Sequence, residues 1–391
     1  MLPDNLRARE FRKILLIKLS AVGDVIHTIP VLNKLRRRYP SAQIDWLVKP
    51  AMADLIRPHP AVNTVLLFEP TDKSSPMAWS GLGWAKLAAQ IRSRRYDLVI
   101  DLQGQLRSAL FAIASGAPVR VGFDRPRRET WQAPQRQRPQ EAYRHCWRGA
   151  REGAWLAYTH PIRVPTLDMP AVDRHLQVGA MLGLDNDPPD FSFAIPPAAS
   201  LAVDRLLDGY GIAAPPAPLL VMAPGTIWET KRWTVEGFAE VARHFMRRGW
   251  PVVLAGSRGE KAICEAVAQA SPGSINLAGQ TSLTELAALL RRSTICLTND
   301  SGPMHLAVAL GRPVVSVFGP TDVLWAGPYH REDAVLAAGL ACSPCYLRLL
   351  SRCPHDHACM KAVSAAAVIA LMEKNLPVRN DLSPAGLTMA G

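Results

Sequence analysis

Polar residues break the apolar pattern of this 391-residue chain at three places where a run of apolar residues ends. The first place is KLSAVGDVIHTIP at 18–30, where Asp24 follows a turn of small residues and opens a helical stretch. A carboxylate in that position could act as a general base that takes a proton from a hydroxyl group. It could equally be a first-turn acid that the helix dipole favours. His27, one turn further on, could contact a substrate or simply pack against its neighbours.

The second place is APGTIWETKRW at 223–233, which follows another apolar run. Only ten of the 45 basic residues are lysines, so Lys231 is distinctive in this loop. Backbone amides together with Thr226 and Lys231 could cradle a diphosphate. The spacing of a Walker A loop is missing. The alternative is a surface loop with a solvated lysine.

The third place is LTNDSGPMHLAVALGRPVVSVFGPTD at 297–322. Asp300 ends an apolar run, Ser301 and Gly302 turn into a helix, and His305 lies in the first turn of that helix. The free amides of a helix start form an anion site. An aspartate and a histidine do little for a buried strand–helix junction, so we expect a function for both.

Short apolar runs alternate with helical stretches, which predicts parallel sheets built from strand–helix–strand units. No G-x-G-x-x-G follows the first strand of either half, which argues against a nicotinamide or flavin enzyme. The predicted strands cover 13–19, 43–48, 62–68, 96–102, 218–224, 250–257, 294–300 and 313–319. The predicted helices cover about 24–39, 84–94, 201–211, 234–249, 260–271 and 282–293, and another begins at Gly302.

A proline-rich stretch separates the two halves of this pattern and indicates an interdomain connection. We therefore expect two Rossmann-like domains that face each other across a cleft. The expected parts are an N-terminal domain at 1–195, a linker at 196–217, a C-terminal domain at 218–374 and a loose tail at 375–391.

Composition and charge narrow the class of protein. The chain is 48% hydrophobic and 20% charged, and no stretch reaches the roughly 18 to 20 apolar residues that span a bilayer. The N-terminus lacks the apolar core of a signal peptide, so we expect a cytoplasmic protein. The net charge of +12 favours a polyanionic partner, either nucleic acid or anionic lipid headgroups. Arginine-rich solvated faces would give the same charge.

Four of the seven cysteines lie together near the C-terminus, so the chain is not a secreted disulfide scaffold. Their spacing is Cys342-x2-Cys345-x7-Cys353-x5-Cys359. A C-x2-C pair is typical of structural zinc, although the second pair is spaced more widely than usual. We expect either a structural zinc site or a cluster of reduced thiols.

Four motifs together resemble the family 9 glycosyltransferases, the ADP-heptose:lipopolysaccharide heptosyltransferases. They are KLSAVGDVIHTIPVL, YDLVIDLQGQLRSA, PGTIWETKRW and TNDSGPMHLAVALGRPVVSVFGPTD, and they occur in the family's order between about residues 13 and 370. The resemblance implies an α/β GT-B fold and an inverting sugar transfer that needs no metal cofactor. It also implies that the domain at 1–195 binds the acceptor and the domain at 218–374 binds the nucleotide-sugar donor.

The resemblance also implies roles for single residues. Asp24 matches the family's catalytic base, Lys231 and Thr226 match residues that hold the donor phosphates, and Glu260 matches a ribose-binding acid. Asp300, Ser301, Gly302 and His305 match the donor loop. The segment 123–150 matches nothing in the family pattern.

The resemblance further implies the substrates and their setting. The donor is ADP-L-glycero-D-manno-heptose, and the acceptor is an anionic lipid-linked saccharide, Kdo-lipid A or heptosyl-Kdo-lipid A. We expect a monomer that acts at the inner leaflet of the inner membrane and binds no nucleic acid. Two alternatives stay open, a GT-B nucleotide-sugar 2-epimerase and a basic nucleic-acid-binding protein.

Overall fold

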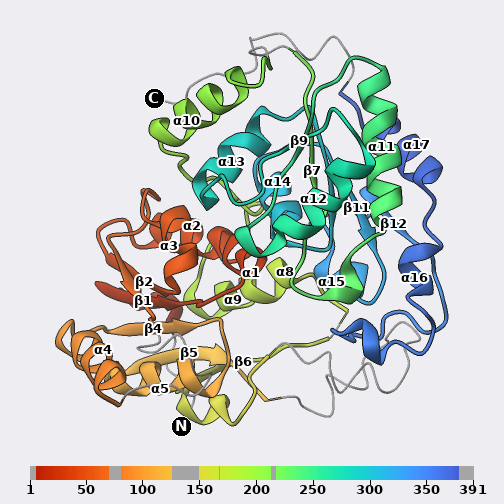
Figure 1. Ribbon diagram of the computed structural model, residues 1–391. Coiled ribbons are helices and arrows are strands. Elements are labelled where there is room, and N and C mark those ends of the chain that lie inside the picture. The colour runs from red at the N-terminus through yellow and green to blue at the C-terminus, as the bar shows by residue number, and fades with distance from the viewer. Residues whose placement is uncertain (1–5, 70–80, 126–148, 167, 213–216, 378–391) are drawn as a thin grey trace. The chain divides into compact units, whose positions relative to one another are not determined.

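The computed structural model describes residues 6–69, 81–125, 149–166, 168–212 and 217–377. The chain divides into two compact units, 1–194 and 195–391. Each unit contains one six-stranded sheet flanked by helices (Figure 1). The two units are described separately below.

The sheet of the first unit is parallel throughout and has the strand order β3-β2-β1-β4-β5-β6. Because β1 lies between β2 and β4, the strand order reverses at β1, which makes this the switch point where open α/β sheets bind ligands. The strands predicted in the first half are confirmed as β1 to β4, whereas β5 and β6 were not predicted. The strands are β1 (Lys13–Ile17), β2 (Gln43–Val48), β3 (Thr64–Leu67), β4 (Leu98–Asp101), β5 (Val119–Phe123) and β6 (His160–Ile162).

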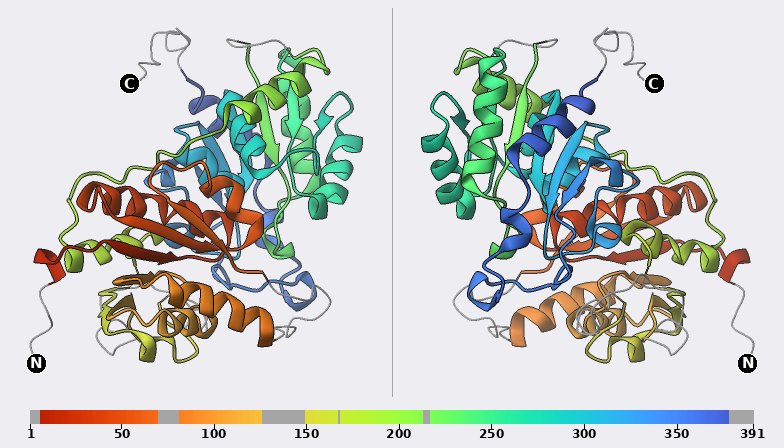
Figure 2. Two further views of the ribbon diagram at one scale, coloured as in Figure 1. Left: turned by 90° about the vertical axis from the view of Figure 1, so that its left-hand side faces the viewer. Right: turned by 90° about the vertical axis from the view of Figure 1, so that its right-hand side faces the viewer.

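One predicted helix of the first unit is two helices. Pro30 lies in the first turn of α2 and has no N–H for an intrahelical bond, so the expected helix over 24–39 is divided into α1 and α2. Figure 2 shows α2 and α5 on opposite sides of the sheet. The helices are η1 (Leu6–Ala8), α1 (Val22–Ile26), α2 (Ile29–Arg38), α3 (Pro50–Ile56), α4 (Gly81–Ser93), α5 (Leu106–Ala114), η2 (Ala154–Ala157), α8 (Ala171–Leu176) and α9 (Val178–Leu182).

The second sheet repeats the topology of the first. Its order is β12-β11-β10-β7-β8-β9, and all its pairs are parallel, so its switch point lies between β7 and β10. The four strands predicted in this half are confirmed as β7, β8, β10 and β11. The strands are β7 (Leu220–Ala223), β8 (Val252–Leu254), β9 (Ile275–Asn276), β10 (Ile295–Asn299), β11 (Val314–Phe318) and β12 (Val335–Ala337).

The helices of the second unit begin with α10, which lies inside the expected linker and packs against α13. The predicted capping box of α13 is confirmed, since Ser282 and Glu285 exchange hydrogen bonds of 2.7 and 3.2 Å. The helices are α10 (Pro197–Asp208), η3 (Glu229–Lys231), α11 (Val235–Arg247), η4 (Arg258–Glu260), α12 (Lys261–Ala270), α13 (Leu283–Arg292), α14 (Gly302–Ala309), α15 (Val323–Ala326), η5 (Glu332–Ala334), η6 (Leu350–Arg352), α16 (Ala358–Lys361) and α17 (Ala365–Lys374).

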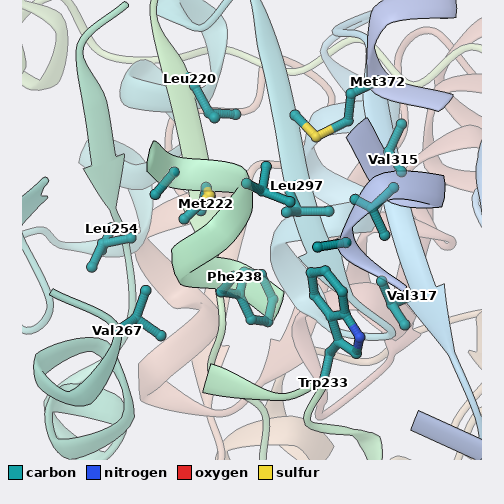
Figure 3. Close-up of a cluster of buried hydrophobic side chains, with 14 of the residues drawn as sticks. Leu220, Met222, Trp233, Phe238, Leu254, Val267, Leu297, Val315, Val317 and Met372 are labelled. Atoms are coloured by element: carbon teal, nitrogen blue, oxygen red, sulfur yellow. The ribbon is translucent and has the colours of Figure 1, made fainter. Parts of the chain in front are cut away.

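The core of the second unit contains side chains from the adjacent strands β8, β7, β10 and β11 and from helices that include α11 and α17 (Figure 3). Leu220 of β7 and Leu297 of β10 are fully buried, and Phe238 of α11 and Met372 of α17 pack in the same cluster. Since α17 contributes to this core, the ordered C-terminal part of the unit extends through α17. The rest of the expected tail, 378–391, lies outside the described residues.

Candidate active site

Lys231 and Asp300 meet at the switch point of the second sheet. The side-chain amide of Asn299, at the end of β10, accepts from the Trp233 N–H (2.9 Å) and donates to the Pro224 carbonyl (2.8 Å). It therefore fixes the loop after β7 against the end of β10. This arrangement brings Lys231 Nζ to 2.5 Å from Asp300 Oδ2, with only 14% and 6% of the two side chains exposed.

Thr321 completes this group from the end of the neighbouring strand β11. Its hydroxyl donates to Asp300 Oδ2 over 2.6 Å. The GPTD turn at 319–322 thus lies beside Asp300, as expected if the two strands are neighbours. Asp300 therefore accepts from both a lysine and a threonine.

Thr226 and Glu260 lie on the loops after β7 and β8. Thr226 is buried, and its carbonyl accepts from Arg232 Nε over 3.1 Å. The Glu260 side chain covers Gly225, where an added Cβ would lie 2.5 Å from Glu260 Cδ. Gly225 is therefore required for this close approach, which places Glu260 beside the Thr226 loop.

The helix α14 begins at Gly302 with Ser301 as its capping residue. The Ser301 side chain accepts no hydrogen bond from the helix, and its hydroxyl donates to the Asn299 carbonyl instead. Pro303 has no N–H, and the Met304 N–H donates to the Ser301 carbonyl over 3.2 Å, so the Gly302 N–H is the first-turn amide that remains available to an anion. His305 lies in the same turn and is 8% exposed.

The predicted donor residues thus follow three strands that are adjacent in the sheet, β8, β7 and β10, and Thr321 follows the next strand, β11. All of them lie at the carboxyl edge, where ligands bind in open α/β sheets. The structure brings Lys231 into direct contact with Asp300, and Glu260 into contact with Gly225. It gives no direct contact between Glu260 and Asp300.

Trp228 and Arg348 belong to the same region but were not predicted. The Trp228 ring centre lies 4.4 Å from Lys231 Nζ and 4.8 Å from Arg348 Cζ, both cation–π distances. A tryptophan in a polar loop between a glycine and a lysine was the available signal for Trp228. Arg348 is remote in sequence, and no local pattern pointed to it.

The cysteine-containing segment 342–359 is attached to the loop that carries Lys231. The Thr230 hydroxyl donates to the Leu347 carbonyl over 2.5 Å. His357 Nε2 bonds to the Thr230 carbonyl over 2.7 Å. These bonds hold the residue next to Lys231 from two points of the segment.

The four cysteines of this segment are free thiols. Burial, and then the nearby thiols of Cys345, Cys342 and Cys353, raise the pKa of Cys359 to about 11. The thiols therefore lie near one another. Within the described part of the chain, however, no three His, Cys, Asp or Glu side chains are placed to hold a metal ion. The expected zinc site is thus not confirmed.

Asp24 lies at the switch point of the first sheet, above a buried lysine. Lys18 Nζ is 3.5 Å from Asp24 Oδ1 and donates to the Leu102 carbonyl over 2.9 Å. The Lys18 side chain is 6% exposed, and that of Asp24 is 46% exposed. Asp24 Oδ2 accepts from the Ala21 N–H over 3.2 Å. The carboxylate is therefore fixed in place and still open to solvent.

The charges around Asp24 keep it ionised. Burial raises the pKa of Asp24, but the positive charge of Lys18 and the nearby His27 and His175 lower it more, so the net pKa lies below its usual value. Burial, and then the charges of Lys18 and Arg174, hold the pKa of His175 well below its usual value. At neutral pH the site thus contains a carboxylate and a neutral His175.

Asp101 supports the lysine from the end of β4. It is fully buried and accepts from the Tyr158 hydroxyl (2.8 Å) and the Gln103 N–H (2.9 Å). It therefore fixes the turn that begins with Leu102, the acceptor for Lys18. Neither Asp101 nor Lys18 was predicted to have a role, although each is a charged residue at the end of an apolar run.

Comparison with known proteins decides the family. The family model "Glycosyltransferase family 9 (heptosyltransferase)" matches residues 84–148 and 140–352. The lipopolysaccharide heptosyltransferase 1 of Pseudomonas aeruginosa is 32% identical over 339 residues, which cover 85% of this chain and 86% of that protein. The chain belongs to glycosyltransferase family 9.

Solved structures of family 9 proteins share the fold. A family 9 glycosyltransferase of Veillonella parvula has a TM-score of 0.74 at 21% identity, with 93% of this chain and 97% of that chain covered. The E. coli ADP-heptose LPS heptosyltransferase II has a TM-score of 0.67 at 23% identity, with 93% and 99% covered. This family 9 glycosyltransferase therefore has the expected α/β GT-B fold, and its two switch-point clusters belong to an enzyme.

Proposed function

We propose that this glycosyltransferase transfers heptose from ADP-L-glycero-D-manno-heptose to the inner core of lipopolysaccharide. The observation that carries the proposal is the 32% identity to a lipopolysaccharide heptosyltransferase 1 over 85% of the chain. The acceptor is Kdo-lipid A or heptosyl-Kdo-lipid A. The 2-epimerase and nucleic-acid alternatives are not favoured, because the chain belongs to a glycosyltransferase family.

Asp24 is the general base in this proposal. The acceptor hydroxyl gives its proton to the Asp24 carboxylate while its oxygen forms a bond to the anomeric carbon of heptose. The bond between that carbon and the diphosphate oxygen breaks, and its electron pair leaves with ADP. A single displacement of this kind inverts the anomeric centre. The ionised and solvent-open state of Asp24 supports the role.

Lys231 and the first turn of α14 stabilise the charge that develops on ADP. Support comes from the available N–H of Gly302 and from Thr226 and Lys231, which lie on the loop after the neighbouring strand β7. Hydrogen bonds to a charged group contribute about 1.5 to 3 kcal/mol each. Several of them can replace a divalent cation. Lys231 must then exchange part of its contact with Asp300 for the diphosphate. Glu260 binds the ribose.

A donor screen tests the proposal. The purified protein is incubated with ADP-heptose, UDP-sugars or GDP-sugars and extracted lipid A core, and the products are identified by mass spectrometry. We expect the mass of the acceptor to increase by one heptose with ADP-heptose and to stay unchanged with UDP-sugars or GDP-sugars. Transfer from another nucleotide sugar, or conversion of a donor without acceptor, would overturn the assignment.

The place of action follows from the acceptor. We propose that the protein works in the cytoplasm as a monomer and lies peripherally on the inner membrane. A net charge of +12 favours contact with the anionic acceptor and with anionic lipids. No described helix is long and apolar enough to cross a membrane.

We also propose that Cys342, Cys345, Cys353 and Cys359 bind a structural zinc ion. The C-x2-C pair and the proximity of the four thiols support this proposal. The thiols are not arranged as ligands in the structure, so zinc binding requires the side chains to turn toward the ion. The role would be to stabilise the segment that holds Thr230, not to take part in the transfer.

A further inference from the structure

The helix α5 has large apolar side chains on two opposite sides. One side is buried against the first sheet and includes Phe111. The other side is open to solvent, with Leu106, Leu110 and Ile113 exposed by 47%, 40% and 53%. Their spacing of four and three residues places them on one side of the helix. A helix that is apolar all round is normally buried on all sides, so the outer side of α5 needs a partner.

The short helix η2 extends the same apolar surface. It packs against α5 and carries Leu156, which is 82% exposed. The Glu152 carboxylate, just before η2, accepts from the Leu106 N–H over 3.2 Å and ties the two elements together. The four exposed side chains Leu106, Leu110, Ile113 and Leu156 are called the α5–η2 face. Figures 1 and 2 show α5 next to α4, on the side of the sheet away from α2.

Single exposed apolar residues are normal on a soluble protein, but a contiguous patch marks a site of interaction. Elsewhere in the described residues, the large exposed apolar side chains are single ones at Leu201, Tyr210 and Ile227 and one adjacent pair, Leu349 and Leu350. The α5–η2 face instead joins four of them on two packed elements. It is the stronger candidate for a docking surface.

Basic side chains lie around this face, together with the Glu152 carboxylate that accepts from the Leu106 N–H. Arg107 is the single charged residue within α5 and η2. The Arg92 side chain lies against Gly116, just beyond the end of α5, where an added Cβ would be 1.3 Å from its Nη1. An apolar centre with basic residues at its edge complements an anionic lipid surface.

We infer that the α5–η2 face docks on an anionic lipid bilayer. Leu106, Leu110, Ile113 and Leu156 enter the boundary between headgroups and acyl chains, while Arg107 and its basic neighbours contact lipid phosphates. The nine-residue α5 lies in the plane of the membrane. The inference rests on the proposed function only in that a lipid-linked acceptor requires such contact. The surface itself is argued from exposure and charge.

Vesicle sedimentation tests the inference without any measurement of activity. The wild-type protein is expected to sediment with vesicles of phosphatidylethanolamine and phosphatidylglycerol, and much less with vesicles of phosphatidylcholine. The double variant Leu110→Glu, Ile113→Glu should bind the anionic vesicles at least roughly tenfold more weakly, because two apolar side chains no longer leave water. Leu201→Glu, on the exposed side of α10, is the matched control and should bind like wild type.

Three further measurements give the experiment a clear outcome. Circular dichroism and thermal melting should show that the double variant folds like wild type, since both side chains are exposed. Transfer to a deacylated, water-soluble acceptor should be unchanged in the double variant. Absence of that transfer in the wild type would contradict the proposed function alone. Unchanged vesicle binding by the double variant would overturn the inference. The inference would also be overturned if the wild type formed a dimer and the double variant a monomer, since the face would then join two copies of the chain.

Discussion

Lys231 and Asp300 form an ion pair of 2.5 Å across the two strands between which the second sheet reverses its order. One partner follows the first strand of this sheet, and the other follows the fourth. The pair therefore depends on the parallel topology and not on proximity in sequence. A diphosphate that binds here must compete with Asp300 for the ammonium group.

Replacement of Lys231 by alanine is expected to lower kcat/KM by roughly 10² or more, because one preorganised stabiliser of the leaving diphosphate is lost. Added Mg²⁺ should not restore the activity. The wild type should keep its activity in EDTA, provided that the cysteine segment keeps any metal it binds. Lys374→Ala, an exposed lysine at the end of α17, is the control. Strict Mg²⁺ or Mn²⁺ dependence of the wild type would contradict this account.

Replacement of Asp24 by asparagine is expected to remove nearly all transfer while donor affinity stays within a few-fold of wild type. The amide keeps the size of the side chain but cannot take the proton. Asp54→Asn, which changes an exposed carboxylate on α3, should have little effect. Turnover above about a tenth of the wild-type value with saturating substrates would show that another group is the base.

Replacement of Lys18 by methionine is expected to change the pH dependence. The Lys18 charge lowers the pKa of Asp24, so its removal raises that pKa toward or above the usual value. The base must be ionised, and the acid limb of kcat/KM should therefore move to higher pH. Donor affinity should not change. An acid limb at the same pH in both proteins would show that Lys18 does not control the ionisation of Asp24.

The same ion pair affects stability in acid. A carboxylate whose pKa is lowered in the folded state stabilises that state above its unfolded pKa. This contribution is lost as the pH falls through the folded value. Compared with the Lys18→Met variant, the wild type should therefore lose more of its stability as the pH falls below about 4. Thermal melting in that range measures the difference.

Purified protein is expected to contain about one equivalent of zinc if the four-cysteine segment is a structural site. A Cys345→Ser, Cys353→Ser variant should lose the metal, whereas Cys264→Ala, a buried cysteine of α12, should keep it. Removal of the metal should lower the melting temperature. Much less than one equivalent, with four thiols of the segment open to titration, would exclude the site.

The sequence predicted the parts of the fold that have a strong local pattern. Buried strands such as β1 and β10 were found because each is a continuous apolar run ended by polar residues. Short strands such as β6 and β9 have three and two residues and are held by pairing with their neighbours. No local pattern marks such strands.

The candidate site divides in the same way. Asp24, Lys231 and Asp300 lie in the segments that connect β1, β7 and β10 to the next helix, so a correct order of strands was enough to predict their edge of the sheet. Arg348 contacts the Trp228 ring although it lies 117 residues after Lys231 in the chain. The hydrogen bond between Thr230 and Leu347 spans the same number of residues. Lys18 was not predicted as a site residue, because a lysine at the end of an apolar run normally indicates only where the strand ends. Only the folded structure shows that Lys18 Nζ lies 3.5 Å from Asp24 Oδ1.

Each half of the chain carries its own lysine–aspartate pair at its own switch point. The two pairs differ in which of the two charged side chains is more exposed to solvent. In the first half the lysine is buried and the carboxylate is 46% exposed. In the second half the aspartate is the more deeply buried partner, at 6% against 14% for the lysine. Each half also contains its own six-stranded sheet, and the second half has its own hydrophobic core. Substitutions around one pair can therefore accumulate without repacking the other half. If the first half binds the acceptor and the second half the donor, as proposed, this independence would allow a lineage to change its acceptor while retaining its nucleotide sugar.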